Sequence, residues 1–112
     1  MKKIEAIIRT EKQEKVMERL RSIGVKGMTI SQAVGWSKER PVQLHFRGTS
    51  YQVDLLPKVK FEIVVSDEET ERVVQAILES ARTEEVGDGI IFIQNLDEVI
   101  NIHSGEKGGK SA

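Results

Sequence analysis

Residues 53–65 read VDLLPKVKFEIVV and contain the strongest strand signal in the chain. Apolar side chains alternate with other residues at Val59, Phe61, Ile63 and Val65, which is the period of a strand with one buried face. Pro57 near the start of this stretch indicates an edge position or a bend, because proline has no N–H to donate to a sheet.

A helix is expected directly after this strand. Ser66 and Glu69 have the spacing of a capping box, in which both side chains satisfy free N–H groups at a helix N-terminus. The apolar residues that follow recur at helical spacing. They would form one face: Val73, Val74, Ile77, Leu78 and Ala81.

The N-terminal part has the same order of strand and helix. Residues 3–9, KIEAIIR, predict a strand covered on both sides. Thr10 would cap a helix that ends at Gly24, a natural left-handed C-cap, and residues 26–34 predict a second strand. The apolar face of this helix would consist of Val16, Met17, Leu20 and Ile23.

The remaining segments have weaker signals. From Gly35 to Ser50 no apolar period is convincing, so we expect one long loop there. A second loop spans 82–89 and ends in Gly-Asp-Gly, after which residues 90–93 predict a short strand. Residues 97–103 predict a short helical turn or strand, and the glycine-rich end predicts a mobile tail.

This order of elements predicts an α+β fold, the ferredoxin-like double βαβ sandwich, in a single domain over residues 1–112. Both helices would cover one face of an antiparallel sheet. The other face would expose apolar residues such as Ile7 and Val64. A homotrimer or another oligomer is the simplest cover for that face.

Composition excludes several classes of protein. The 112 residues are 38% hydrophobic and 31% charged, as in a soluble globular protein. The absence of cysteine removes disulfide scaffolds, thiolate metal sites and cysteine nucleophiles. A net charge of -1 gives no attraction to nucleic acid. The chain has neither a long apolar stretch nor a signal-peptide pattern at its start, so we expect a cytoplasmic protein.

Catalytic chemistry is not indicated. The two histidines, His45 and His103, are far apart, and no catalytic triad, zinc-protease or phosphate-loop motif is present. We therefore do not expect an enzyme, and the sequence identifies no metal site.

The predicted loop at 35–50 is long enough to indicate a function. It carries the basic residues Lys38, Arg40 and Arg47 together with exposed apolar candidates, a mixture that suits docking onto another protein. The alternative is that Trp36 and Phe46 fold back onto the body. Residues 87–89 likewise allow two interpretations, an ordinary turn or an anion-binding nest.

Several segments together resemble the P-II signal-transduction proteins, a family of small trimeric nitrogen regulators. The resemblance runs along the whole chain. It rests on KKIEAIIR near the start, IGVKGMT at 23–29, RG-x-x-Y at 47–51, VDLLPKVK at 53–60, ARTEEVGDG at 81–89 and SGE at 104–106.

The resemblance implies a trimer with ATP or ADP bound between neighbouring subunits. It also implies a projecting T-loop at about 37–55, a B-loop at about 82–90 and a flexible C-terminal segment at about 102–112. The T-loop would contact a target enzyme or membrane transporter. A nucleic-acid partner is not expected. The T-loop candidates are Lys38, Glu39, Arg40, Leu44, His45, Phe46, Arg47 and Tyr51, with Tyr51 at the position that some members modify.

By position, the nucleotide cleft would have two sides. The base side would be Gly27, Met28, Thr29, Glu62 and Val64. The opposite side would be Gly35, Ser37, Lys38, Lys58, Gly87, Asp88, Gly89 and Ile90, with Asn101 and His103 from the C-terminal segment.

Departures from the family pattern concern the phosphate side. Ile90, Asn101 and His103 replace a lysine and two arginines, and Glu39 replaces the glutamine that holds magnesium and contacts 2-oxoglutarate. Ser37 and Pro41 replace glycines. The loss of three cationic partners would cost on the order of 5 kcal/mol. We therefore expect weak binding of adenine nucleotides (ATP, ADP or AMP) and no dependable response to magnesium and 2-oxoglutarate.

Three functions remain open at this point. The first is a non-catalytic P-II-like regulator that controls its partner through the T-loop, with weakened sensing. The second is a divergent sensor whose inter-subunit cleft binds AMP, ADP, a small anion or a metal instead of ATP. The third is a trimer that has lost sensing and keeps only a structural role.

Overall fold

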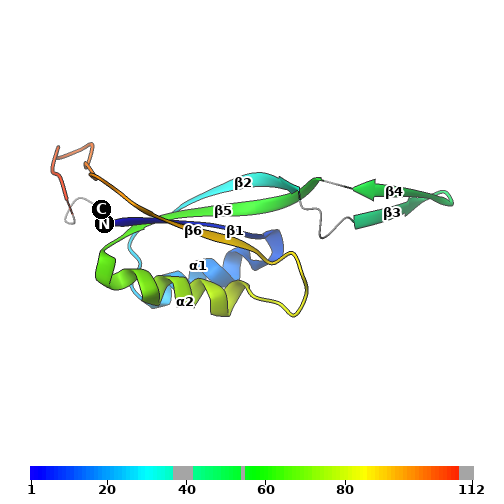
Figure 1. Ribbon diagram of the computed structural model, residues 1–112, viewed down its shortest axis with the longest axis horizontal. Coiled ribbons are helices and arrows are strands. Elements are labelled where there is room, and N and C mark those ends of the chain that lie inside the picture. Colours follow the sequence, from blue (N-terminus) through cyan, green and yellow to red (C-terminus); the bar gives the residue numbers. More distant parts are fainter. Residues whose placement is uncertain (37–41, 54, 109–112) are drawn as a thin grey trace.

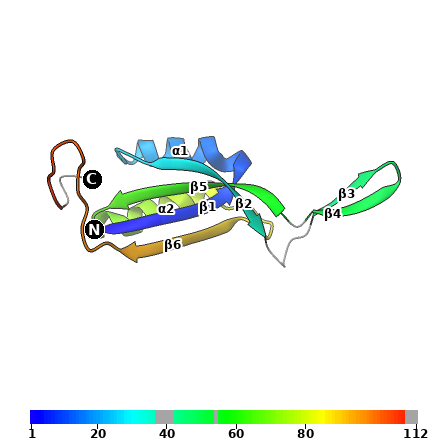
Figure 2. The same ribbon diagram turned by 90° about the horizontal axis from the view of Figure 1, so that it is seen from above.

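The computed structural model describes residues 1–36, 42–53 and 55–108. Four strands form one antiparallel sheet in the order β2-β5-β1-β6 (Figure 2). Their bounds are β1 Lys2–Arg9, β2 Thr29–Trp36, β5 Leu55–Val65 and β6 Gly89–Asn95. The helices α1 (Gln13–Ser22) and α2 (Thr70–Ala81) lie on the same side of the sheet (Figure 1). The predicted ferredoxin-like α+β fold is confirmed.

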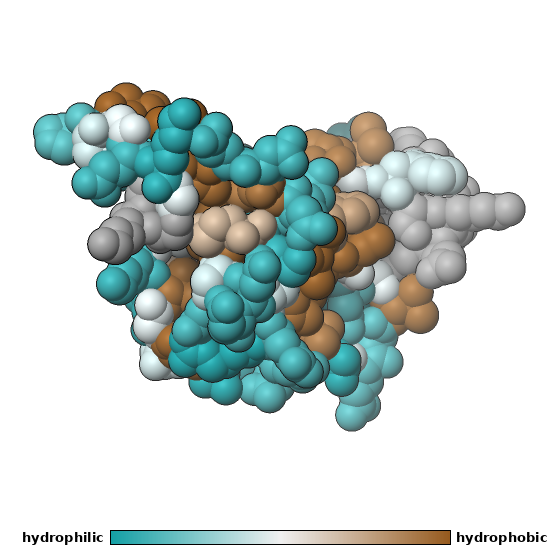
Figure 3. Space-filling model, turned by 60° about the vertical axis from the view of Figure 1, so that its left-hand side comes forward, coloured by the Kyte–Doolittle hydropathy of each residue, from teal (hydrophilic) through white to brown (hydrophobic). Residues whose placement is uncertain are grey.

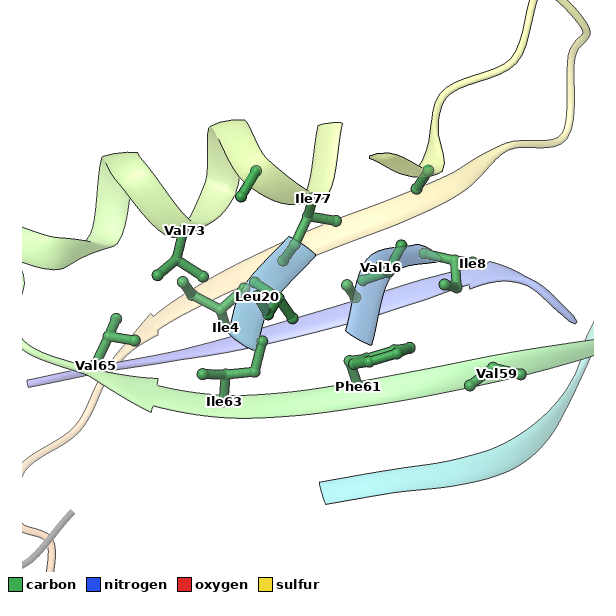
Figure 4. Close-up of a cluster of buried hydrophobic side chains, with 13 residues drawn as sticks. Ile4, Ile8, Val16, Leu20, Val59, Phe61, Ile63, Val65, Val73 and Ile77 are labelled. Carbon is green, nitrogen blue, oxygen red and sulfur yellow. The ribbon is translucent and has the colours of Figure 1, made fainter. Parts of the chain in front are cut away.

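The hydrophobic core lies between this sheet face and the two helices (Figure 4). The alternation read from the sequence is confirmed, because the even residues of β1 and the odd residues of β5 from Val59 are buried. Helix α2 buries Val73, Ile77 and Ala81 as predicted, but Ala76 and Ser80 are also buried, whereas Val74 and Leu78 are half-buried. The core residues are Ile4, Ala6, Ile8, Val16, Leu20, Val59, Phe61, Ile63, Val65, Val73, Ala76, Ile77 and Ala81.

The opposite sheet face has no cover among the described residues, as the sequence predicted. Val64 is 37% exposed and Ile7 is half-buried. The residues around them alternate in charge, with ion pairs from Lys3 to Glu62 and from Lys60 to Glu5.

The prediction of one long loop at 35–50 is wrong, because much of this segment forms strands. Strands β3 (Val42–Phe46) and β4 (Thr49–Val53) form a separate two-stranded hairpin that projects from one end of the body (Figures 1 and 2). Arg47 and Gly48 form its turn with φ values of 52° and 77°, the positive pair that a two-residue hairpin turn requires. Val42, Leu44 and Phe46 alternate with polar residues, which is a strand period that our reading of this segment as a loop overlooked.

Four smaller predictions need correction. The second strand begins at Thr29 and extends to Trp36, beyond the predicted range 26–34. Thr10 does not cap a helix; it begins a 3-10 turn over Thr10–Lys12, and its hydroxyl donates to Glu11. The capping box also fails, because Ser66 makes no side-chain cap bond and the Glu69 carboxylate accepts from Arg72 instead. Residues 97–103 contain neither a helix nor a strand; Ile100 forms an isolated bridge with Lys107, and a single turn follows in which the Gly105 N–H donates to the Asn101 carbonyl.

The predicted C-cap at Gly24 is confirmed. Gly24 has a φ of 92° and donates its N–H to Arg21, while Val25 donates to Leu20. This pair of bonds is the Schellman arrangement that ends many helices. It turns the chain toward β2.

The loop between α2 and β6 is held by the Asp88 carboxylate. Asp88 accepts from the backbone N–H of Thr83 at 2.7 Å, from the Thr83 hydroxyl and from Arg9 Nε at 3.0 Å. Burial alone would raise the pKa of Asp88, but these hydrogen bonds outweigh it and hold that pKa below its ordinary value. The loop is therefore fastened to the end of β1 by an ionised carboxylate.

Gly89 follows this loop and cannot be replaced without backbone movement. Its φ is 117°, and a Cβ atom at this position would lie 1.8 Å from the Ile7 carbonyl oxygen. We expect Gly89→Ala to lower the free energy of unfolding by roughly 3 kcal/mol, from strain and overpacking together. Urea denaturation at fixed protein concentration measures this. Gly27→Ala is the control, because a Cβ there meets nothing within 4 Å, and equal stability of both variants would contradict the expectation.

Asp88 should contribute pH-dependent stability. Its pKa is lower in the folded than in the unfolded chain, so its contribution is complete above the unfolded value of about 3.9 and disappears as pH falls through the folded pKa. We expect Asp88→Asn to cost about 2 kcal/mol at pH 7 and progressively less below about pH 4. Urea titrations from pH 7 to pH 3 test this, with the exposed Asp97→Asn as control. If the loss of stability in Asp88→Asn does not change with pH, the ionised Asp88 carboxylate does not stabilise the loop.

Candidate functional site

A cavity of about 780 Å³ lies at the end of the body that carries the termini (Figure 3). The predicted base-side residues Gly27, Met28, Thr29, Glu62 and Val64 all line it. The cavity exists because the pairing of β2 with β5 ends at Thr29 and Glu62, so β2 does not cover β5 beyond this point. Its volume is typical of small-molecule sites.

Glu62 is one of two carboxylates that line this cavity, together with Glu69. Its carboxylate lies 2.7 Å from Lys3 Nζ. This hydrogen bond lowers the pKa of Glu62 and raises the pKa of Lys3. An ionised carboxylate can only accept hydrogen bonds, so it suits a ligand that presents an N–H donor.

A second cluster lies at the base of the hairpin. The Lys58 side chain extends past Gly35, where a Cβ atom would lie 3.2 Å from its Cγ, and its ammonium donates to the Gly87 carbonyl at 3.0 Å. The structure thus brings together three of the residues predicted for the opposite side of the cleft. Ile90 follows on β6 and is 54% exposed. Asp88 does not offer a free carboxylate, because Arg9 and Thr83 occupy it.

The two clusters lie apart in one chain. Lys58 and Glu62 are four residues apart on β5, and Val64 is two residues further, which places the clusters about 13–20 Å apart. Asn101 and His103 follow the far end of β6, near Val99, which lines the first cavity. A single chain therefore does not unite the predicted cleft residues into one site.

The C-terminal candidates are less available than the sequence suggested. Asn101 Oδ1 accepts the Ser104 N–H at 3.1 Å, and the Asn101 backbone bonds to Glu106 and Gly105. This side chain builds a hydrogen-bonded loop within the segment that was predicted to be flexible. His103 is exposed. Residues 109–112 lie outside the described part of the chain.

Of the predicted docking residues, Lys38, Glu39 and Arg40 lie outside the described part of the chain, as do the cleft candidate Ser37 and the substituted Pro41. On the hairpin, Leu44 is paired with Tyr51 and His45 with Ser50, while Arg47 lies exposed in the turn and Phe46 is paired with Thr49. Trp36 is 63% exposed, so it does not fold back onto the body.

Sequence reasoning missed Arg9 and Thr83. Both act on the 82–88 loop, and Arg9 is the residue of β1 directly opposite Lys58. Only the strand register shows this pairing. A threonine five residues before an aspartate is too common a pattern to identify alone.

Two further searches cover the described part of the chain only. Over residues 1–36, 42–53 and 55–108, no group of three or more histidine and acidic side chains is placed to hold a metal ion. In the same ranges, no helix has the length and apolar character needed to cross a membrane.

Comparison with known proteins agrees with this architecture. The profile of the family described as Nitrogen regulatory protein P-II matches residues 1–106. Nitrogen regulatory protein P-II 2 of Methanothermobacter thermautotrophicus is 47% identical over 111 residues, covering 99% of this chain and 96% of that protein. Nitrogen regulatory protein P-II of Azospirillum brasilense is 46% identical, with 97% of each chain covered. The protein of the same name from Rhizobium meliloti is 46% identical, with 96% of each covered.

These matches span nearly all of the chain, including both clusters and the hairpin that joins β2 to β5. The chain therefore belongs to the P-II family of nitrogen regulatory proteins, which are signal-transduction regulators and not enzymes.

Proposed function

We propose that this chain works as a cytoplasmic homotrimer that binds an adenine nucleotide between its subunits and controls a target enzyme or membrane transporter through residues 37–55, the segment that contains the β3–β4 hairpin. One observation carries the proposal. The residues predicted for one nucleotide cleft form two clusters at opposite ends of the sheet. A neighbouring copy is the simplest way to bring one end of the sheet against the other.

The uncovered sheet face supports assembly. Ile90 and Phe92 are 54% and 44% exposed on β6, and Val64 lies on the same face. Apolar side chains on a continuous sheet face are stabilised when another surface covers them. The paired charges of Lys3 and Glu62 lie on the same face, so neither would enter an interface without a partner.

The two cleft sides differ in how well they suit ATP. The base side offers a cavity and the ionised Glu62 carboxylate, which an adenine amino group can contact. The phosphate side offers Lys58, but Ile90 places an apolar side chain next to the turn and Asn101 is engaged in its own loop. These contacts support weak ATP binding. Glu39, the candidate for magnesium and 2-oxoglutarate, lies outside the described residues.

The same contacts favour a second candidate function. A cleft with few cations on its phosphate side discriminates less against AMP than against ATP, because AMP has fewer charges to neutralise. The alternative is therefore a sensor of AMP, ADP, a small anion or a metal ion at the same interface. Calorimetry with each of these ligands separates the alternatives, and heat from AMP at a lower concentration than from ATP would favour this one.

New cations on the phosphate side should create ATP affinity. We expect the unmodified protein to bind ATP with a Kd of millimolar or weaker. Each added cation, in Ile90→Lys and in Ile90→Lys/His103→Arg, should tighten binding about tenfold. Asn101 is retained because its amide holds the C-terminal loop. Calorimetry and the fluorescence of the single tryptophan, Trp36, both measure the affinity.

The control for this titration is Ile102→Lys, which adds the same charge at a fully exposed position beside His103. It should leave ATP affinity within about twofold of the unmodified protein. Micromolar ATP binding by the unmodified protein would show that the substitutions at Ile90, Asn101 and His103 do not weaken the site.

The hairpin should be dispensable for folding and necessary for partner binding. Trp36 and Leu55 are directly paired, so residues 37–54 can be replaced by an Asn-Gly turn that closes the β2–β5 ribbon. We expect this variant to keep the oligomer mass and stability of the full chain. Proteins recovered by the full chain in a pull-down should be lost, and equal recovery by both would contradict hairpin docking. Tyr51 remains the candidate modification site within this segment.

A further inference from the structure

We propose that Arg9 is a positioning residue for the turn at Gly87–Gly89, which it shapes to receive an anionic group of the ligand. The inference rests on the proposed ligand site at this turn. Arg9 was not among the residues that the sequence singled out. Its role follows from its contacts at the end of β1.

Arg9 makes two separate contacts with the loop. Its Nε donates to Asp88 Oδ1 at 3.0 Å, and its Nη2 donates to the Val86 carbonyl at 3.0 Å. The side chain is only 11% exposed. The guanidinium is thus directed into the loop and is not available to contact a ligand directly.

Arg9 and Lys58 hold two successive carbonyl groups of the turn. Arg9 binds the carbonyl of Val86, and Lys58 Nζ binds the carbonyl of Gly87. In a planar trans peptide, the N–H points away from the carbonyl of the same unit. The N–H groups of Gly87 and Asp88 are therefore directed away from the two cations.

These two amides are free to receive a ligand. Over residues 1–36, 42–53 and 55–108, neither the Gly87 nor the Asp88 N–H has a protein acceptor. Successive N–H groups in a turn with a positive φ, here 100° at Gly87, form a concave site for anions. The backbone provides the donors, and Arg9 sets their direction.

Arg9 also neutralises the one carboxylate in the turn. Asp88 lies between Gly87 and Gly89, and its negative charge would repel an anion bound to the neighbouring amides. The ion pair with Arg9 and the two hydrogen bonds from Thr83 compensate this charge. Arg9 therefore has two separable effects, a geometric one through its planar fork and an electrostatic one through its charge.

The choice of substitution separates these effects. Arg9→Gln removes the charge and the fork, whereas Arg9→Lys keeps the charge and replaces the fork by a single ammonium. The matched control is Arg19→Gln, which breaks a similar 3.0 Å ion pair to Glu79 between the two helices. All variants are prepared as the full chain and checked by urea denaturation.

The test is an NMR titration with ATP, and in parallel with inorganic triphosphate, that follows the amide signals of residues 87–90. We expect Arg9→Gln to shift the Gly87 and Asp88 amide signals of the free protein and to weaken ATP binding about tenfold or more. Arg9→Lys should remain at least fivefold weaker than the unmodified protein, because charge alone does not orient the turn. Arg19→Gln should change neither the signals nor the affinity.

Several outcomes would overturn the proposal. If Arg9→Lys binds as the unmodified protein does, charge and not positioning is what Arg9 supplies. If Arg9→Gln binds ATP as tightly as Arg19→Gln does, Arg9 has no role in the site. If ATP shifts no amide signal of residues 87–90 in the unmodified protein, the ligand site itself is wrong, and that result is distinct from the other two.

Thr83→Val provides a second variant in case Arg9→Gln does not fold. It removes the hydroxyl donor to Asp88 and keeps the backbone donor and Arg9. The same signals should shift, with a smaller loss of affinity of about threefold. Unchanged signals and affinity in this variant would contradict the idea that the clamp on Asp88 shapes the turn.

Discussion

Strands β1 and β2 pair with different stretches of β5, and this displacement shapes both ends of the sheet. Strand β5 pairs with β1 from Lys58 to Val65 and with β2 from Leu55 to Glu62, so its two neighbours are displaced by about 10 Å. At one end β5 continues without β2, and a cavity forms beside Val64. At the other end β2 and β5 continue without β1 as a two-stranded ribbon, from which the hairpin projects.

Each end has its own electrostatic arrangement. At the cavity, Lys3 lowers the pKa of Glu62, and the ionised carboxylate can only accept hydrogen bonds. At the hairpin base, Arg9 and Lys58 hold the carbonyl groups of a turn and direct its amides outward. One end thus favours a ligand donor and the other a ligand anion. A nucleotide carries both, so the proposed nucleotide site between two copies would bring these two ends together.

Lys58 links the 82–88 loop to the end of β2 at the base of the hairpin. Lys58 contacts Gly87 in the 82–88 loop and passes over Gly35 on β2, one residue before Trp36, the last residue of that strand. A ligand that binds the Lys58 ammonium would compete with its hydrogen bond to Gly87 and would alter its contact with Gly35.

Local patterns in the sequence were sufficient for the four strands of the main sheet, for the two helices and for the buried face, but not for the hairpin strands β3 and β4. Burial of alternate residues in a strand, or of every third to fourth residue in a helix, can be read from neighbouring residues alone. Thus Val59, Phe61, Ile63 and Val65 were assigned correctly, and Gly24 was correctly placed at a helix end. The base-side residues of the cleft followed from resemblance and do line one cavity. What only the tertiary structure decided depends on register between distant segments: the stagger on β5, the partners of Asp88, and Arg9 opposite Lys58. The hydrogen bond between Arg9 and Asp88 joins residues nearly eighty positions apart. The residues next to each partner in the sequence do not show which distant segment will lie beside it.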